Sequence, residues 1–188
     1  MIAANLNNNI KSKKKFWTEL ILYQMSRILY LVRHAQAESD QSRGSDRERA
    51  LTYTGHQDAI QLGEYLTKVN SNINLIISSP AIRALSTAYL IAERINFDLK
   101  HIQTEESIYS RNHLEIIKRL NKFPESTNEV LLVGHYPTIV ELYNYLSTHE
   151  TRTTMNTAEL CSLNFDVPWL EVTSGSGYSG SIFYPHSI

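Results

Sequence analysis

Arginine and histidine side chains lie at or just beyond the ends of three separate apolar runs in this sequence. The side chains concerned are Arg33, His34, Arg83 and His135. A guanidinium group matches the oxygens of a phosphate in bidentate geometry, and an imidazole can attack phosphorus to form a covalent intermediate. Two arginines and two histidines that meet in one pocket would therefore suit the transfer of a phosphoryl group.

The three apolar runs predict buried strands of a parallel sheet. They cover residues 28–32, 75–77 and 130–133, and each passes into a polar or glycine-containing segment. Short runs rich in branched side chains are typical of strands that are covered on both faces. Because ligands of open α/β sheets bind beyond the carboxyl ends of such strands, we expect the four side chains to meet at one sheet edge.

Helical patterns alternate with these strands. Helices are predicted to begin near Thr52, Pro80 and Pro137 and to cover His113–Asn121, and later strands are predicted near 160–165 and 181–184. The stretch 35–49 is predicted to be a loop, and the Gly/Ser-rich run 174–180 a hairpin loop. This alternation indicates an α/β fold, a three-layer α/β/α sandwich around a mainly parallel sheet.

The first residues differ in composition from the rest. They are rich in asparagine, then in lysine, and an apolar run follows. Glu19 and Gln24 interrupt that run, and no small-residue cleavage site follows it before the first predicted strand. The pattern does not favour a secretory signal, so we expect a cytoplasmic protein. We predict that residues 1–26 are an extension, either disordered or the product of a mis-assigned translation start, and that residues 27–188 form one domain. A short amphipathic helix at a membrane is the alternative for the extension.

Composition excludes several classes of protein. The formal net charge of −1 gives no general attraction to nucleic acid or acidic membranes, and the single cysteine, Cys161, excludes an internal disulfide framework. No apolar stretch is long enough to span a bilayer. We therefore expect no nucleic-acid partner and no integral membrane segment.

The order and approximate spacing of four motifs resemble the histidine phosphatase superfamily, and within it the small phosphohistidine phosphatase SixA group. The motifs are Arg33-His34-Ala35-Gln36-Ala37-Glu38, Asp46 to Thr52 with Gly55, Ser78-Ser79-Pro80 with Arg83-Ala84 and Thr87-Ala88, and Val133-Gly134-His135-Tyr136-Pro137. The resemblance extends over about residues 27–165. It implies a phosphoglycerate mutase-like fold and a phosphatase that works through a phosphohistidine intermediate.

His34 is the candidate nucleophile. One ring nitrogen would attack phosphorus while the other keeps its proton through a carbonyl or carboxylate acceptor. Arg33, Arg83 and His135 would surround the phosphoryl group and stabilise its charge. His135 follows Gly134, and a glycine suits a backbone that approaches a ligand closely. The resemblance adds Arg49, before Leu51-Thr52, as a further phosphate-binding cation.

The general acid is less well defined. Many members of the superfamily place a carboxylate after the second helix, and in this chain that segment holds Glu105 and Glu106, of which Glu106 aligns better. The alternative is that both are surface charges. A phosphoramidate such as phosphohistidine needs a strong acid less than an alkyl phosphate does, because imidazole leaves more readily than alkoxide.

Neither a metal nor another cofactor is expected. The seven histidines include no pair at i, i+4 with a glutamate between, and no GxxxxGK[ST] run is present. Four cationic side chains in one pocket would also repel a divalent ion.

The sequence is compatible with three functions. The first is a phosphatase for phosphohistidine on a protein, and the second is a small-molecule phosphomonoesterase of the same fold. The third is a non-catalytic phosphate-binding module, against which the intact His34 argues. Only about 34 residues, 96–129, separate the second helix from the third strand, so we expect an open pocket that admits a phosphorylated protein.

Overall fold

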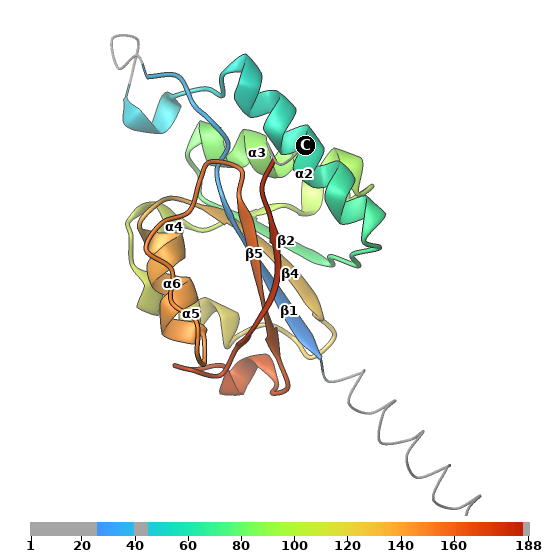
Figure 1. Ribbon diagram of the computed structural model, residues 1–188, viewed down its shortest axis with the longest axis vertical. Coiled ribbons are helices and arrows are strands. Elements are labelled where there is room, and N and C mark those ends of the chain that lie inside the picture. The colour runs from blue at the N-terminus through green and yellow to red at the C-terminus, as the bar shows by residue number, and fades with distance from the viewer. Residues whose placement is uncertain (1–25, 40–44, 186–188) are drawn as a thin grey trace, which may run out of the picture.

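The computed structural model describes residues 26–39 and 45–185, which form a six-stranded sheet with helices on both faces (Figure 1). The strands lie in the order β3-β2-β4-β1-β5-β6. Their bounds are β1 Arg27–Arg33, β2 Leu75–Ser78, β3 Gln103–Thr104, β4 Glu129–Gly134, β5 Leu160–Phe165 and β6 Tyr178–Phe183. The predicted N-terminal extension, residues 1–26, lies outside the described residues except for its last one.

The sheet is parallel in its centre and antiparallel at one side. β1 pairs with β4, β4 with β2 and β2 with β3 in parallel, whereas β5 runs antiparallel to both β1 and β6. In register, Arg33 lies opposite Gly134 and Ser78 opposite Val133. The carboxyl ends of β1, β2 and β4 therefore reach the same edge, as predicted.

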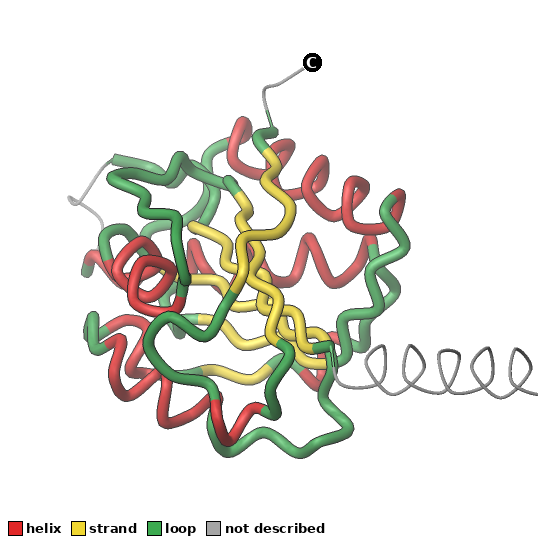
Figure 2. Tube along the Cα trace, turned by 60° about the horizontal axis from the view of Figure 1, so that its bottom comes forward, coloured by secondary structure: helices red, strands yellow, loops and turns green. Residues whose placement is uncertain are grey.

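Helices cover the two faces of the sheet separately (Figure 2). The α-helices are α2 Tyr53–Lys68, α3 Ile82–Arg94, α4 Glu106–Tyr109, α5 His113–Leu120 and α6 Thr138–Leu146. Within the described residues, the connections contain the 3₁₀-helices η1 Asp46–Glu48, η2 Leu99–His101 and η3 Trp169–Glu171. Residues of α2 and α3 pack on one face, and those of α4, α5 and α6 on the other.

The alternation of side chains along β1 explains the two cores. Leu29 and Leu31 pack toward α5 and α6, and Tyr30 and Val32 pack toward α2 and α3. Successive side chains of a strand point to opposite faces, so an unbroken apolar run is what a strand between two helical layers requires. The predicted three-layer α/β/α architecture is confirmed.

Local signals account for the start of α2. The hydroxyl of Thr52 accepts a hydrogen bond from the Gly55 amide at 3.0 Å, which satisfies a backbone donor that the first helical turn leaves open. A Cβ on Gly55 would lie 2.1 Å from the carbonyl oxygen of Gln36, so glycine lets the helix approach the segment that follows β1.

Two of the predicted loops contain more structure than expected. The Gly/Ser-rich run is not all hairpin loop, because β6 begins at Tyr178 and pairs from there with Asn164 of β5. Backbone pairing with a neighbouring strand overrides the low strand preference of glycine and serine. The stretch 35–49 likewise contains η1 and an isolated bridge between Ala37 and Leu51.

Candidate active site

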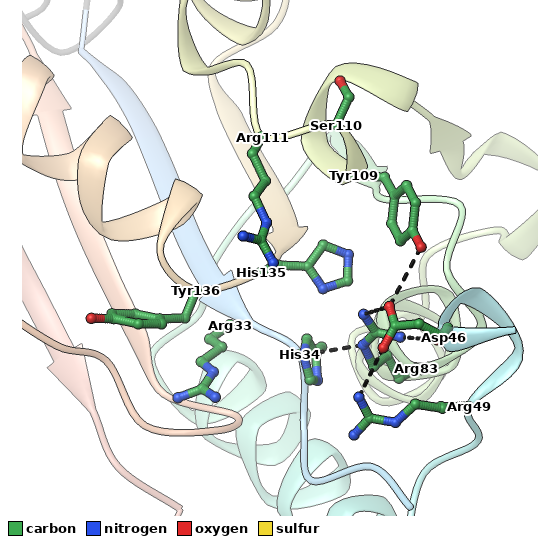
Figure 3. A pocket seen from close by; sticks show the side chains of 10 residues that line it. All are labelled: Arg33, His34, Asp46, Arg49, Arg83, Tyr109, Ser110, Arg111, His135 and Tyr136. Atoms are coloured by element: carbon green, nitrogen blue, oxygen red, sulfur yellow. Dashed lines mark hydrogen bonds and ion pairs between the residues drawn. The ribbon is translucent and has the colours of Figure 1, made fainter. Parts of the chain in front are cut away.

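A pocket of about 500 Å³ opens at the carboxyl edge of the sheet (Figure 3). Its lining consists of Arg33, His34, Asp46, Arg49, Arg83, Tyr109, Ser110, Arg111, His135 and Tyr136. Five of the six predicted site residues are therefore brought together, from segments far apart in the chain. Cationic and imidazole groups predominate, and Asp46 supplies the one carboxylate among the lining residues that the structure describes.

His34 is held as a neutral imidazole in one tautomer. Its Nδ1 lies 2.8 Å from the carbonyl oxygen of Ala35, which can only accept, so Nδ1 carries the hydrogen. Nε2 is left as an acceptor, and Nε of Arg83 donates to it at 3.3 Å. Burial, aided by the nearby cations, lowers the pKa of His34 to about 4. The imidazole is thus unprotonated at neutral pH.

His135 faces His34 with its ring centroid 5.0 Å away. Its Nε2 lies 2.7 Å from Oγ of Ser79, and that Oγ accepts a hydrogen bond from the Ala81 amide. We assign the serine hydroxyl as the donor to Nε2, and this assignment places the hydrogen of the neutral ring on Nδ1. Nδ1 is buried and has no hydrogen-bond partner among the described residues. Burial lowers the pKa of His135 to about 3, so it too is neutral.

Arg83 is the buried cation of the pocket. Besides its contact with His34, its Nη2 donates to Oδ2 of Asp46 at 2.8 Å and its Nη1 donates to the Asp46 backbone carbonyl. Thr87, one turn later on α3, accepts from the Ala35 amide and donates to the Arg83 carbonyl. This hydroxyl ties the helix that carries Arg83 to the segment that carries the nucleophile candidate.

Arg33 and Arg49 lie on the two sides of the pocket. Arg33 donates from Nη1 to the carbonyl oxygen of Met155 at 2.7 Å and lies over the ring of Tyr136, 5.6 Å from its centroid. Its guanidinium is therefore directed away from His34 (Figure 3). Arg49 donates from Nη1 to Oδ1 of Asp46 at 3.0 Å.

Asp46 is a site residue that sequence reasoning missed, although it stands in one of the quoted motifs. Burial would raise its pKa, but hydrogen bonds from Arg49 and Arg83 outweigh that effect and lower it. The carboxylate is therefore ionised at neutral pH.

Glu106 does not line the pocket. Its carboxylate accepts from both Nη atoms of Arg47, the shorter distance being 2.8 Å, and its side chain is 59% exposed. Glu105 instead caps α4 by accepting from the Ser107 amide. The structure thus does not bring the predicted general acid to the reacting groups, and the surface-charge alternative describes both residues better.

The remaining lining residues come from two segments. Tyr109 is the last residue of α4, and Ser110 and Arg111 lie in the turn between α4 and α5. No motif or periodicity gave a signal for this segment. Tyr136 follows His135 directly, and that position was the only hint of its role.

Gly134 has a packing role and not the ligand-approach role expected for it. A Cβ at this position would lie 2.7 Å from a side-chain carbon of Ile108 and 2.8 Å from one of Ile139. Glycine therefore lets α4 and α6 pack against the end of β4.

The described part of the chain contains neither a metal-binding cluster nor a membrane-spanning helix. Residues 26–39 and 45–185 contain no group of three or more His, Cys, Asp or Glu side chains able to hold a metal ion. Of the helices within these ranges, none is long and apolar enough to cross a membrane.

The fold and the cationic pocket define a phosphoglycerate mutase-like α/β protein. The model of the histidine phosphatase superfamily (branch 1) matches residues 29–113. Together with the shared fold, this match confirms the predicted resemblance to that superfamily. No curated protein matches the sequence.

Solved structures with the same fold include two SixA proteins. One, assigned as phosphohistidine phosphatase SixA from Nakamurella multipartitia, has a TM-score of 0.73 at 22% identity and covers 86% of this chain and 98% of that one. The protein histidine phosphatase SixA complexed with tungstate has a TM-score of 0.70 at 21% identity, with 84% and 97% covered. A mycobacterial glucosyl-3-phosphoglycerate phosphatase has a TM-score of 0.58 at 17% identity, with 79% and 95% covered.

Proposed function

We propose that this protein is a phosphatase in which His34 carries the phosphoryl group between substrate and water. The observation that supports this most directly is the state of His34. Its Nδ1 hydrogen is held by the Ala35 carbonyl and its Nε2 lone pair faces the pocket beside Arg83. A neutral imidazole with a fixed tautomer is the form that can attack phosphorus.

The proposed reaction has two displacements. Nε2 of His34 attacks phosphorus, a P–N bond forms, and the bond from phosphorus to the leaving group breaks. A water molecule then attacks the phosphorus carried by His34, the P–N bond breaks, and inorganic phosphate leaves with the oxygen and protons of that water while the neutral imidazole is restored. Such transfers depend mainly on positioning and on stabilisation of charge on the phosphoryl oxygens.

The cationic and polar groups of the pocket fit that requirement. Arg83 and Arg49 present guanidinium groups to the space beside His34. The unpaired Nδ1 of His135 provides a buried N–H that a phosphoryl oxygen would satisfy. Arg33 donates to the Met155 carbonyl at the pocket wall, so in this position it would stabilise the phosphoryl group through its charge alone. It would donate a hydrogen bond to the phosphoryl group only if its side chain turned when substrate binds.

For the substrate, we propose phosphohistidine on a protein. Within the described part of the chain, Asp46 is the only carboxylate that lines the pocket, and it is ionised by its arginine partners, which suits it poorly to protonate an alkoxide. Phosphohistidine makes a smaller demand on such an acid. The pocket is also open to solvent, since Tyr136 at its rim remains 44% exposed. Of the SixA proteins that share the fold, one is assigned as a phosphohistidine phosphatase and the other is described as a protein histidine phosphatase, which agrees with this proposal.

The alternative is hydrolysis of a small phosphate ester. The same fold occurs in a glucosyl-3-phosphoglycerate phosphatase. Arg111 at the pocket wall would offer such a substrate a second cation for an additional anionic group.

The test compares wild type with His34→Ala on an aryl phosphate, a phosphohistidine carrier protein and a panel of sugar phosphates. We expect His34→Ala to abolish turnover of all of them, and brief exposure of wild type to labelled substrate to place acid-labile, base-stable phosphate on His34. His101→Ala, on the exposed η2, is the matched control. Activity of His34→Ala close to that of wild type would refute the nucleophile, and a strong preference for sugar phosphates would favour the alternative substrate.

A further inference from the structure

The carboxylate of Asp46 occupies a position that an oxyanion would take. Its Oδ2 accepts from Nη2 of Arg83 at 2.8 Å and its Oδ1 accepts from Nη1 of Arg49 at 3.0 Å. The hydroxyl of Tyr109 points at Oδ2 from 3.4 Å (Figure 3). Two guanidinium groups and a phenol thus converge on one small anion supplied by the protein.

The same arginine also contacts the nucleophile candidate. Nε of Arg83 lies 3.3 Å from Nε2 of His34 while its Nη2 holds Asp46. The anion position is therefore immediately beside the atom that would attack phosphorus. Carboxylates and phosphates engage a guanidinium with the same fork geometry, so the two compete for the same donors.

A phosphoryl group cannot take these donors while Asp46 keeps them. Arg83 is buried and held on its other side by His34, so its side chain has little freedom to serve a second anion elsewhere. Asp46 in contrast lies on the short η1, and its side chain is 44% exposed. The carboxylate is the partner able to move, and two anions on one pair of cations repel each other.

We propose that Asp46 is a tethered anion that competes with the phosphoryl group for Arg83 and Arg49 and thereby promotes release of product phosphate. It yields to a substrate that makes further contacts and returns to the arginines when only inorganic phosphate remains. This inference rests on the proposed function in one respect, that the pocket binds a phosphoryl group.

Competition by Asp46 should raise the apparent Kd of phosphate. A ligand that binds only when a competing group has left shows its intrinsic Kd divided by the fraction of molecules in which that group is away. Neutralising the carboxylate should therefore tighten phosphate binding. If Asp46 merely positioned the arginines, or accepted a proton from water, its neutralisation would weaken phosphate binding or leave the affinity unchanged.

The experiment measures the Kd of inorganic phosphate by calorimetry, together with product inhibition of aryl phosphate hydrolysis. For Asp46→Asn we expect the phosphate Kd and the product inhibition constant to fall together by about threefold to tenfold, the factor that one or two partly exposed ion pairs represent. We expect kcat/KM to rise, because substrate no longer has to displace the carboxylate. Asp46→Ala should lower both constants as well. This second variant is needed because the asparagine side chain can still form hydrogen bonds with the arginines.

The matched control is Glu115→Gln, which neutralises an ion-paired carboxylate on α5 that does not line the pocket, and phosphate should bind to it as to wild type. Thermal melting checks that each variant is folded. A phosphate Kd for Asp46→Asn equal to or higher than that of wild type would overturn this inference, but it would not contradict the proposed phosphatase activity. Absence of phosphate binding to wild type and every variant would overturn both.

Discussion

Nε of Arg83 lies 3.3 Å from Nε2 of His34, although the two residues are 49 positions apart in the sequence. This contact joins the segment after β1 to the first turn of α3. It places a permanent positive charge beside the lone pair that would attack phosphorus, and that charge disfavours protonation of the imidazole. Once Asp46 releases it, the same guanidinium can donate to the phosphoryl oxygens during transfer.

Replacement of Arg83 should therefore reduce chemistry strongly. We expect Arg83→Ala to lower kcat/KM for an aryl phosphate by about 10²- to 10³-fold, the usual cost of one preorganised donor to a transition-state oxyanion. Arg83→Lys should recover only part of this loss, because an ammonium group cannot donate in a fork. Arg94→Ala, at the exposed end of the same helix, is the control. Equal activities of Arg83→Ala and Arg94→Ala would contradict the assignment.

The protonation state of His34 gives a pH prediction. Because burial lowers its pKa to about 4, the imidazole should remain neutral and reactive well below the ordinary histidine pKa of about 6.5. We expect NMR titration of the His34 ring in the folded, ligand-free protein to show a midpoint near that low value. In Arg83→Gln the midpoint should rise, since a nearby cation is removed. A wild-type midpoint near 6.5 would show that His34 is not buried as described.

Ser79 should fix the tautomer of His135. In Ser79→Ala the partner of Nε2 is lost, so the hydrogen can move between the two ring nitrogens and the N–H directed at the phosphoryl group is no longer assured. We expect kcat/KM to fall by about tenfold, near the cost of one hydrogen bond to a charged group. Nitrogen chemical shifts of His135 should change from one tautomer to a mixture. Ser86→Ala on α3 is the control, and an unaltered tautomer in Ser79→Ala would refute this role of Ser79.

Glu106 provides a prediction of little effect. Since its carboxylate is exposed and paired with Arg47, Glu106→Gln should change turnover of alkyl phosphates, aryl phosphates and phosphohistidine only slightly. Steady-state rates on the three substrates check this directly. A large loss confined to alkyl phosphates would restore Glu106 as the general acid and would require the η1 segment to rearrange on binding.

Metal independence is a separate prediction. A pocket that contains Arg33, Arg49, Arg83 and Arg111 has a charge that opposes a divalent cation. We expect activity to persist in excess EDTA. Loss of activity that Mg²⁺ or Zn²⁺ restores would overturn this prediction.

The sequence by itself determined the central strands of the sheet and which residues lie together at their carboxyl ends. Unbroken apolar runs that end in Arg33-His34, in Ser78-Ser79 and in Gly134-His135 are a local signal, and parallel strands must end at one edge. The convergence of His34, Arg83 and His135 followed from this pattern without any knowledge of side-chain contacts.

Only the tertiary structure decided which charges meet. Asp46 forms an ion pair with Arg83, and Glu106 forms one with Arg47. Arg33 donates a hydrogen bond to the Met155 carbonyl. These pairings depend on how the connecting segments pack over the strand ends. An ion pair between residues 37 positions apart leaves no periodicity in the sequence, because its geometry is set by the fold and not by neighbouring residues.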